Sequence, residues 1–303
     1  MSLNMAVNLG GLLMKNPVTT ASGTFAAGRE YNDFVDVSTL GAVTTKGVSL
    51  HGWAGNDTPR IAETPSGMLN SIGLQNPGVK HLMDVDIPWL NDQGATIIVN
   101  VSGHSFDEYL AVVDELEQAC VHAYEINISC PNVDAGGMTL GTDPKCVESI
   151  VKKIRDATDR PLIVKLTPNV TSITDIAKAA EAGGADAISL INTLLGMSID
   201  AERMRPTMAR VVGGLSGSCV KPVALRMVWE CHQAISLPIL GMGGIMNGLD
   251  AVEFILAGAS AVAVGTANFV NPFATQEVIE GIADYCERHG VNDVNELIGA
   301  LKC

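Results

Sequence analysis

Residues 162–193 read LIVKLTPNVTSITDIAKAAEAGGADAISLINT. The two ends of this stretch, LIVKLTP (162–168) and AISLINT (187–193), are short apolar runs of the kind that form buried strands. The segment between them, NVTSITDIAKAAEAGGA, has apolar residues at helical spacing and ends on Gly183–Gly184, a common helix stop. A strand, a helix and a second strand in this order predict a parallel βαβ unit.

The same alternation continues along most of the chain. Six more apolar runs are PVTTASG (17–23), AVTTKGV (42–48), TIIVNVSG (96–103), YEINISC (124–130), PILGMGG (238–244) and AVAVGTA (261–267). Helix-like segments lie between most of them, including 105–121, where Ser105 is a predicted N-cap with Glu108 three residues later. Eight such units predict a (β/α)8 TIM barrel. An open doubly wound sheet is the rival, but it usually has fewer strands and a GxGxxG motif after the first, which this chain lacks.

Three further segments complete the predicted architecture. NLGG (8–11), between two short apolar stretches, is typical of a hairpin turn near the N-terminus. The connections 49–76 and 194–219 are too long for plain turns and both follow strands, so we expect extended loops at the C-terminal face, acting as lids or partner surfaces. Since no linker or repeat interrupts the pattern, residues 1–303 are predicted to form one domain.

Composition narrows the class of protein. A formal net charge of −14 argues against nucleic-acid binding, which needs a basic surface. There is no apolar run of membrane-spanning length, and the first residues lack the features of a signal peptide. The seven cysteines are scattered without paired spacing, which is typical of reduced thiols in the cytoplasm and predicts neither disulfides nor a metal site.

Four polar residues stand within otherwise apolar strands: Lys46, Asn100, Asn127 and Lys165. A buried lysine or asparagine needs a partner, and any one of them alone could belong to a structural hydrogen-bond network. Because the carboxyl ends of parallel strands meet at one mouth of a barrel, we expect the four to converge there. Two cations and two amides predict a site for a planar, anionic, hydrogen-bonding ligand.

Glycines at the last two strands predict a phosphate site. Gly243–Gly244 follow the seventh strand, Gly265–Thr266 end the eighth, and GGLSGSCVKP (213–222) adds a glycine-rich turn before a helix. Each glycine alone could be an ordinary turn residue. Together they occupy the loops in which such barrels bind phosphate, so a phosphate-bearing cofactor is expected.

Cys130 ends the fourth strand in EINISCPNV (125–133). It is either a small buried residue at a strand end or a reactive thiol at the mouth of the site. Pro131 disfavours helical geometry at residue 130, so the strand should run on extended and place the thiol beside Asn127. A cysteine there is a workable proton acceptor once it is deprotonated. Four other cysteines are interpreted as packing residues of helices: Cys120, Cys146, Cys231 and Cys286.

These motifs together resemble one enzyme family. TTASGTF, TTKGV, LNSIGLQNPG, INISCPNV, VKLTPN, INTLLGMSID, GGLSG, GMGGI and VGTA occur in the order found in class 1 dihydroorotate dehydrogenases. NISCPN is close to diagnostic of class 1, because the membrane-bound class 2 enzymes carry serine at the position of the base. The run 192–217 is similar to the catalytic subunit of class 1B, which passes electrons to a partner, and less like the fumarate-using class 1A.

The resemblance implies an FMN-dependent oxidation of (S)-dihydroorotate to orotate in pyrimidine biosynthesis, with Cys130 as the catalytic base. It implies flavin contacts from Ser22, Lys46, Gly47, Asn100, Asn127, Lys165 and Ile191, and phosphate contacts from Gly217, Gly243, Gly244, Gly265 and Thr266. It implies pyrimidine contacts from Lys46, Asn70, Ser71, Ile72, Gly73, Leu74, Asn127, Asn192 and Thr193.

The same resemblance implies an assembly. A partner subunit carrying FAD and a [2Fe–2S] cluster would reduce NAD, within a heterotetramer built on a homodimer of this chain. Four alternatives stay open at this point: a fumarate-dependent enzyme of the class 1A type, a related flavoenzyme that oxidises another dihydropyrimidine, a lyase or isomerase barrel that binds a substrate phosphate, and a non-catalytic pyrimidine-binding protein.

Overall fold

Eight parallel strands form the core of the computed structural model, which describes residues 3–129, 134–135 and 138–302. They are β3 (Val18–Thr20), β4 (Val43–Thr44), β7 (Ile97–Val101), β8 (Ala123–Asn127), β11 (Leu162–Lys165), β12 (Ala187–Leu190), β17 (Ile239–Met242) and β18 (Ala261–Val264). They pair in the order β4–β7–β8–β11–β12–β17–β18–β3. Each strand overlaps one of the eight predicted runs, so the predicted (β/α)8 barrel is confirmed.

The strands at the two ends of this sheet, β3 and β4, lie close together. The amide of Gly41 donates to the carbonyl of Val18 at 2.9 Å, and the Thr19 hydroxyl donates to the carbonyl of Ala42 at 2.8 Å. The Thr19 and Thr44 hydroxyls lie 3.1 Å apart inside the barrel. These contacts connect β3 to β4 beside the sheet ladder, and the barrel is thereby nearly closed.

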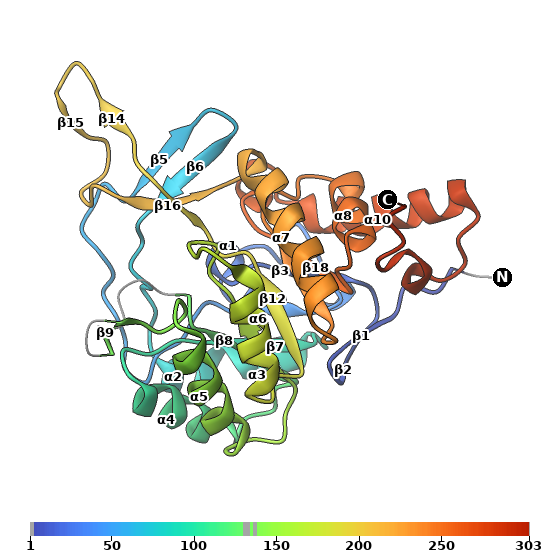
Figure 1. Ribbon diagram of the computed structural model, residues 1–303, viewed down its shortest axis with the longest axis horizontal. Coiled ribbons are helices and arrows are strands. Elements are labelled where there is room, and N and C mark those ends of the chain that lie inside the picture. Colours follow the sequence, from blue (N-terminus) through green and yellow to red (C-terminus); the bar gives the residue numbers. More distant parts are fainter. Residues whose placement is uncertain (1–2, 130–133, 136–137, 303) are drawn as a thin grey trace.

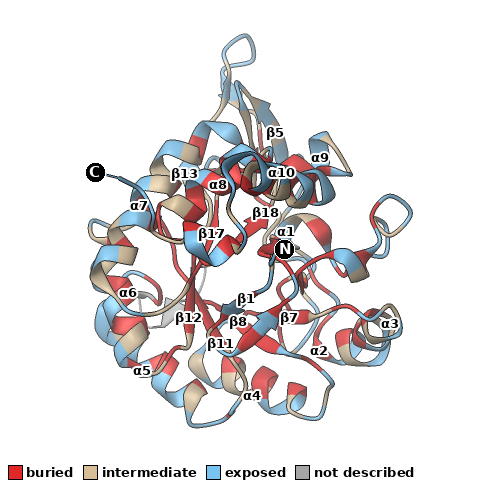
Figure 2. Cartoon of the chain, turned by 90° about the vertical axis from the view of Figure 1, so that its right-hand side faces the viewer, coloured by how far each residue is buried: buried red, intermediate tan, exposed pale blue. Residues whose placement is uncertain are grey.

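Helices surround the strands, as Figures 1 and 2 show. The long ones are α4 (Phe106–Leu116), α5 (Pro144–Arg155), α6 (Ile173–Ala182), α7 (Lys221–Ala234), α8 (Gly248–Leu256) and α10 (Ala274–His289). Shorter ones are α1 (Ser22–Phe25), η1 (Val37–Thr39), α2 (Val79–His81), η2 (Leu82–Asp86), α3 (Ile87–Asp92), η3 (Ser218–Val220), α9 (Ala267–Val270) and η4 (Val294–Leu297).

A side-chain cap begins helix α4 where the sequence predicts it. The Ser105 hydroxyl accepts from the Glu108 amide at 3.3 Å, while the Glu108 carboxylate accepts from the amide of His104 at 2.7 Å. Such caps satisfy amides that have no partner within the helix. The helical placement of Cys120 was wrong, because α4 ends at Leu116 and Cys120 lies exposed beyond it.

A short hairpin closes the N-terminal end of the barrel. Its strands are β1 (Val7–Leu9) and β2 (Leu12–Met14), so the predicted hairpin is confirmed. Gly10 has φ +62°, and a Cβ there would lie 2.3 Å from the carbonyl oxygen of Asp186, the residue just before β12. Only glycine allows the turn to pack this closely beneath the strands.

The two long connections form a second sheet at the C-terminal face. It contains β5 (Ile61–Thr64), β6 (Gly67–Asn70), β13 (Leu194–Gly196) and β16 (Gly213–Ser216), in the order β13–β16–β6–β5. We refer to these four strands as the roof sheet. Its central pair is antiparallel, with Leu69 opposite Leu215. Segments that follow β4 and β12 are thus joined above the mouth of the barrel (Figure 1).

Two small hairpins complete the described strands. They are β9 (Asp134–Ala135) with β10 (Met138–Thr139), and β14 (Ile199–Asp200) with β15 (Arg205–Pro206). No helix in the described ranges is both long and apolar enough to cross a membrane. Within the same ranges, histidine, cysteine and carboxylate side chains do not gather in threes as metal ligands would.

Candidate active site

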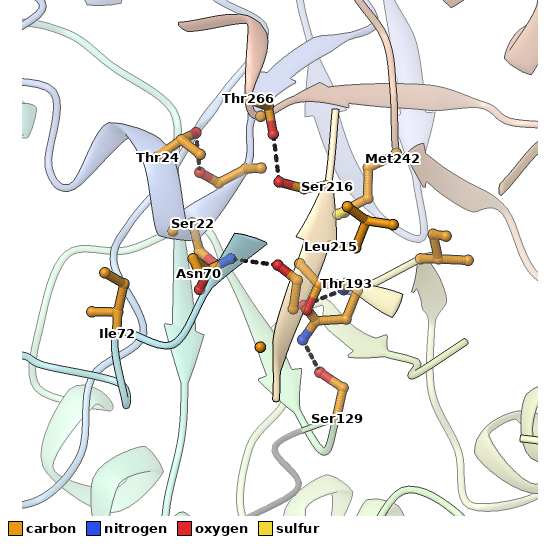
Figure 3. Close-up of a pocket in the computed structure, with 18 of the residues that line it drawn as sticks. Ser22, Thr24, Asn70, Ile72, Ser129, Thr193, Leu215, Ser216, Met242 and Thr266 are labelled. Carbon is orange, nitrogen blue, oxygen red and sulfur yellow. Dashed lines mark hydrogen bonds between the residues drawn. The ribbon is translucent and has the colours of Figure 1, made fainter. Parts of the chain in front are cut away.

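A cavity of about 610 Å³ lies between the mouth of the barrel and the roof sheet. This volume falls within the range of small-molecule and cofactor sites. Figure 3 shows side chains from the strand ends and from the roof sheet pointing into it. The cavity is lined by every sequence-predicted binding residue: Ser22, Lys46, Gly47, Asn70, Ser71, Ile72, Gly73, Leu74, Asn100, Asn127, Lys165, Ile191, Asn192, Thr193, Gly217, Gly243, Gly244, Gly265 and Thr266. Cys130, the predicted base, lies outside the residues that the structure describes.

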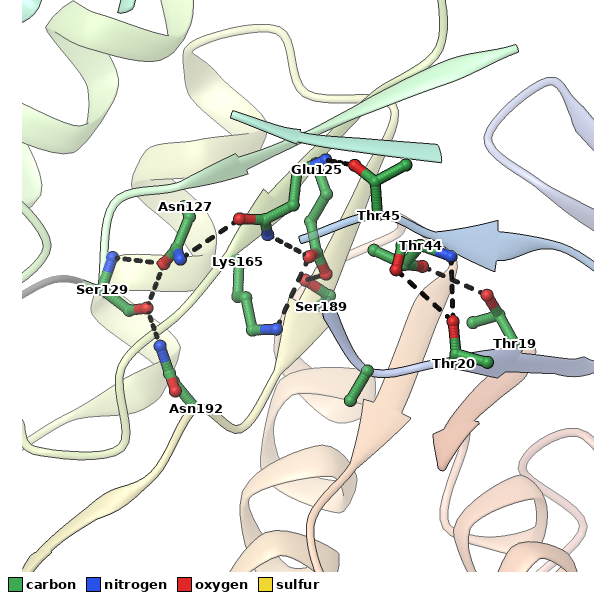
Figure 4. A network of polar contacts seen from close by, with 12 residues as sticks. Thr19, Thr20, Thr44, Thr45, Glu125, Asn127, Ser129, Lys165, Ser189 and Asn192 are labelled. Atoms are coloured by element: carbon green, nitrogen blue, oxygen red, sulfur yellow. Dashed lines mark hydrogen bonds and ion pairs between the residues drawn. The ribbon is translucent and has the colours of Figure 1, made fainter. Parts of the chain in front are cut away.

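A buried carboxylate holds the floor of the cavity together (Figure 4). Glu125, on β8, is fully buried, and its Oε2 lies 3.5 Å from the Lys165 ammonium and accepts from Asn100 Nδ2 at 2.5 Å. Its other oxygen accepts from the Ser189 hydroxyl at 2.7 Å. Three donors, one each from β7, β11 and β12, thus compensate one carboxylate that has no access to water.

A second set of hydrogen bonds runs from this floor toward the rim. Asn127 Nδ2 donates to Asn100 Oδ1 at 3.4 Å, and Asn127 Oδ1 accepts from the Ser129 hydroxyl at 2.5 Å. Asn192 Nδ2 in turn donates to that hydroxyl oxygen. The phenol of Tyr109, on helix α4, donates to the backbone carbonyl of Asn127 at 2.6 Å. These contacts fix which face each amide presents to the cavity, and fixed donors are what a specific polar site requires.

Lys46 lies two residues after the end of β4 and lines the cavity. Its amide donates to the carbonyl of Ala26 at 3.0 Å, and its side chain is half-buried. The following residue has to be glycine, because a Cβ at Gly47 would lie 2.7 Å from Asn100 Oδ1. Close packing of this loop on Asn100 therefore holds Lys46 and Asn100 on the same side of the cavity.

Three glycine-containing turns meet at the opposite end. Gly217, Gly243 and Gly244 have φ values of +103°, +122° and +87°, which other residues rarely adopt. The Thr266 hydroxyl donates to the Ser216 hydroxyl at 2.8 Å, which links the turn after β18 to the end of β16. Exposed backbone amides in such turns bind anions, so this end has the form of a phosphate cradle.

The roof sheet supplies the remaining wall. Asn70 Nδ2 donates to the Gly214 carbonyl at 3.3 Å, across the β6–β16 pair. The carbonyl of Ser71 accepts from Asn56 Nδ2 at 2.9 Å, while the buried hydroxyl of Ser71 has no hydrogen-bond partner in the structure. A buried hydroxyl at a cavity wall that lacks a partner is suited to bind a polar ligand.

Sequence reasoning missed part of this site. Glu125 was not identified as the partner of Lys165, and Ser189 was not identified at all. Both residues could have been identified as polar residues in buried strands, by the same rule that identified Asn100, but that rule does not identify their partners. Neither the cis peptide bond between Leu190 and Ile191 nor the pairing of the two long connections carried a comparable signal.

Comparison of the sequence with those of known proteins identifies the family. The profile of the dihydroorotate dehydrogenase family matches residues 4–285. The chain belongs to the dihydroorotate dehydrogenase family. It is 58% identical over 299 residues to a protein of Alkaliphilus metalliredigens, with 99% of each chain covered. It is 55% identical over 300 residues to one of Lachnoclostridium phytofermentans, covering 99% of this chain and 100% of the relative.

A third relative, from Bacteroides fragilis, is 54% identical over 302 residues, with 99% of each chain covered. All three relatives are named dihydroorotate dehydrogenase B (NAD(+)), catalytic subunit. The family predicted from NISCPN and the other motifs is therefore confirmed, and the relatives carry the name of the class 1B enzyme.

Proposed function

We propose that this chain oxidises (S)-dihydroorotate to orotate in pyrimidine biosynthesis, using bound FMN and passing the electrons through a partner subunit to NAD. The observation that carries this proposal is the convergence of the predicted flavin, phosphate and pyrimidine residues on one cavity. Full-length similarity to dihydroorotate dehydrogenase B catalytic subunits supports it independently.

The donors present fit FMN. The flavin ring would be held by Ser22, Lys46, Gly47, Asn100, Asn127, Lys165 and Ile191, and its phosphate by the turns at Gly217, Gly243, Gly244, Gly265 and Thr266. The cradle supplies close backbone approach where an anion needs it, and the strand ends supply fixed amides and ammonium groups for the ring. FMN, when bound, supplies the acceptor for a hydride.

The pyrimidine would lie on the roof side of the cavity. Asn127, Asn192 and the segment Asn70–Leu74 offer amides and the partnerless Ser71 hydroxyl, with Lys46 and Thr193 beside them. Amide side chains present a donor and an acceptor together, which matches the alternating N–H and C=O groups of a pyrimidine ring. Lys46 would neutralise negative charge on the substrate.

The chemistry required of the protein is the removal of one proton. Oxidation of dihydroorotate takes a proton from C5 and a hydride from C6, and a C5–C6 double bond forms. We propose Cys130 as the base, with its thiolate taking the C5 proton. Since a free thiol has a pKa of about 8.5, turnover should rise with pH until Cys130 is deprotonated. Lys165, held by Glu125, would stabilise the negative charge that accumulates on the cofactor side.

The names of the relatives support a partner subunit. A protein named a catalytic subunit functions with at least one other chain, and the name of those relatives includes NAD(+), which supports NAD as the final electron acceptor proposed here. For this chain we propose a partner with FAD and a [2Fe–2S] cluster, a heterotetramer built on a homodimer of this chain, and a place in the cytoplasm. The five cysteines of the described ranges are free thiols, which suits that compartment.

Visible absorbance under anaerobic conditions tests the half-reaction. The purified chain, loaded with FMN, should lose its flavin absorbance when dihydroorotate is added in the absence of any partner. Flavin that stays oxidised would refute the substrate, and a chain that binds no FMN would refute the cofactor. Fumarate added after bleaching should leave the flavin reduced, whereas rapid reoxidation would show that the chain is its own fumarate reductase.

A further inference from the structure

Two turns of the phosphate cradle meet at the start of helix α7. Gly244 packs on the first residue of that helix, where a Cβ on the glycine would lie 2.8 Å from the amide nitrogen of Lys221 and 3.0 Å from the carbonyl oxygen of Gly217. The positions of the turns at 217 and 243–246 therefore depend on each other. Lys221 itself is absent from the cavity wall, although its neighbour Val220 lines it.

The side chain of Lys221 points to carboxylates on helix α8. Its ammonium lies 2.6 Å from Asp250 Oδ1 and 2.9 Å from Glu253 Oε2. Burial lowers the pKa of Lys221, but the hydrogen bonds to Asp250 and Glu253 and the charges of these carboxylates together raise it by more. The net shift is upward, so the ammonium stays protonated. Because both carboxylates hold it, this ammonium is already compensated on the side away from the cavity.

Asp250 makes a second contact that Glu253 does not. Its Oδ2 accepts from the amide of Met246 at 2.9 Å, at the end of the turn that contains Gly243 and Gly244. Only 12% of the Asp250 side chain is exposed, against 47% for Glu253. The Asp250 carboxylate thus connects the cradle turn after β17 to the first residue of α7. Its Oδ2 binds the Met246 amide of the turn, and its Oδ1 binds the Lys221 ammonium.

We propose that Asp250 and Lys221 form a positioning pair that sets the spacing of the two cradle turns and thereby the affinity for the cofactor's phosphate. This inference rests on the proposed function, since it takes the cradle as the FMN phosphate site. Neither residue lines the cavity. The phosphate would be held by backbone amides of the cradle turns, and its affinity would depend on how the pair positions those turns.

A comparison of two flavins isolates this role. FMN and riboflavin share the isoalloxazine ring and differ in the phosphate, so a defect confined to the cradle should affect FMN alone. We expect Asp250→Ala to weaken FMN binding about tenfold, which is about 1.4 kcal/mol, and to leave riboflavin binding within about twofold. Dissociation constants from the quenching of flavin fluorescence measure both. Glu253→Ala is the matched control, because it removes a Lys221 partner that contacts no cradle turn, and it should leave both affinities nearly unchanged.

Every outcome bears on the pair. Equal losses for FMN and riboflavin, or no loss for either, would overturn the positioning role. Tighter FMN binding by Asp250→Ala would also overturn it, because it would mean that a freed Lys221 ammonium reaches the phosphate. Should Asp250→Ala fail to fold, Lys221→Met tests the same link, and Lys221→Arg should restore FMN affinity. A wild-type chain that binds neither flavin would refute the proposed function instead.

Discussion

Removing the Lys165 ammonium should destabilise the fold as well as the site. Lys165→Met leaves Glu125 fully buried with two neutral donors and no cation. At the observed 3.5 Å and an effective dielectric constant of about 20, the lost attraction between the two charges is about 5 kcal/mol. Breaking a buried pair from one side typically costs about 3–5 kcal/mol, since the remaining charge is left uncompensated.

The double substitution separates this charge effect from lost packing. Glu125→Gln alone should cost about as much as Lys165→Met, because it leaves the ammonium buried without its partner. The double variant should cost less than the sum by about 2–3 kcal/mol, because neither charge is then left alone. At roughly 2 °C per kcal/mol for a chain of this size, each single variant should melt about 6–10 °C below wild type.

Thermal unfolding followed by far-UV circular dichroism measures the cycle. It should be run without FMN and again with FMN in excess, because a ligand that binds only the folded state raises the melting temperature by mass action. The matched control is the exposed pair Lys80–Asp84, whose charged atoms are closer, at 3.1 Å, but whose side chains are 89% and 59% exposed. Its coupling should stay below about 0.5 kcal/mol. A coupling at Lys165–Glu125 no larger than this control would refute the argument from burial.

Three further outcomes are expected. Gly244→Ala should weaken FMN binding by about tenfold or more, through a strained φ and a clash with α7, whereas Gly94→Ala, also at positive φ but with nothing within 4 Å of its Cβ, should leave the Kd for FMN unchanged. Cys130→Ser should keep FMN absorbance and lose most dihydroorotate turnover near neutral pH, and turnover at the wild-type rate would exclude the thiol as base. Partial burial and the charge of Arg160 lower the pKa of His122, so the stability that it contributes is present above its unfolded value of about 6.5 and is lost as pH falls below it. The melting temperature should therefore fall less from about pH 7 to pH 5 in His122→Asn than in wild type, and identical pH profiles would contradict the lowered pKa.

The barrel could be predicted from the sequence because its signals are local. Each strand is a short apolar run, and helices such as α4 and α6 have their own caps and periodicity, so Ser105 and the glycines at 183–184 mark boundaries without knowledge of the rest of the chain. The strand order then follows from chain order, because parallel βαβ units place successive strands side by side. Lys46, Asn100, Asn127 and Lys165 could be assigned to one mouth for the same reason.

The roof sheet and the buried ion pair could not be predicted in this way. Pairing between β6 and β16 joins segments more than a hundred residues apart, and antiparallel register leaves no mark in either segment alone. Glu125 is identified as the partner of Lys165 only when the stagger of β8 against β11 is known. Cys120 was misplaced because the end of a helix is the least certain part of a periodic pattern.

The roof sheet also determines when in its synthesis the chain can bind a ligand. Its four strands come from both halves of the sequence, and the proposed phosphate cradle includes the turn at Gly265–Thr266, which comes shortly before α10 in the sequence. A ribosome-bound chain that has emerged only as far as β12 has half of its ligand-binding wall and no cradle. Contacts of such long sequence separation form late and slowly. Cofactor capture should therefore be among the final events of maturation, and the appearance of flavin colour would report on completion of the whole barrel.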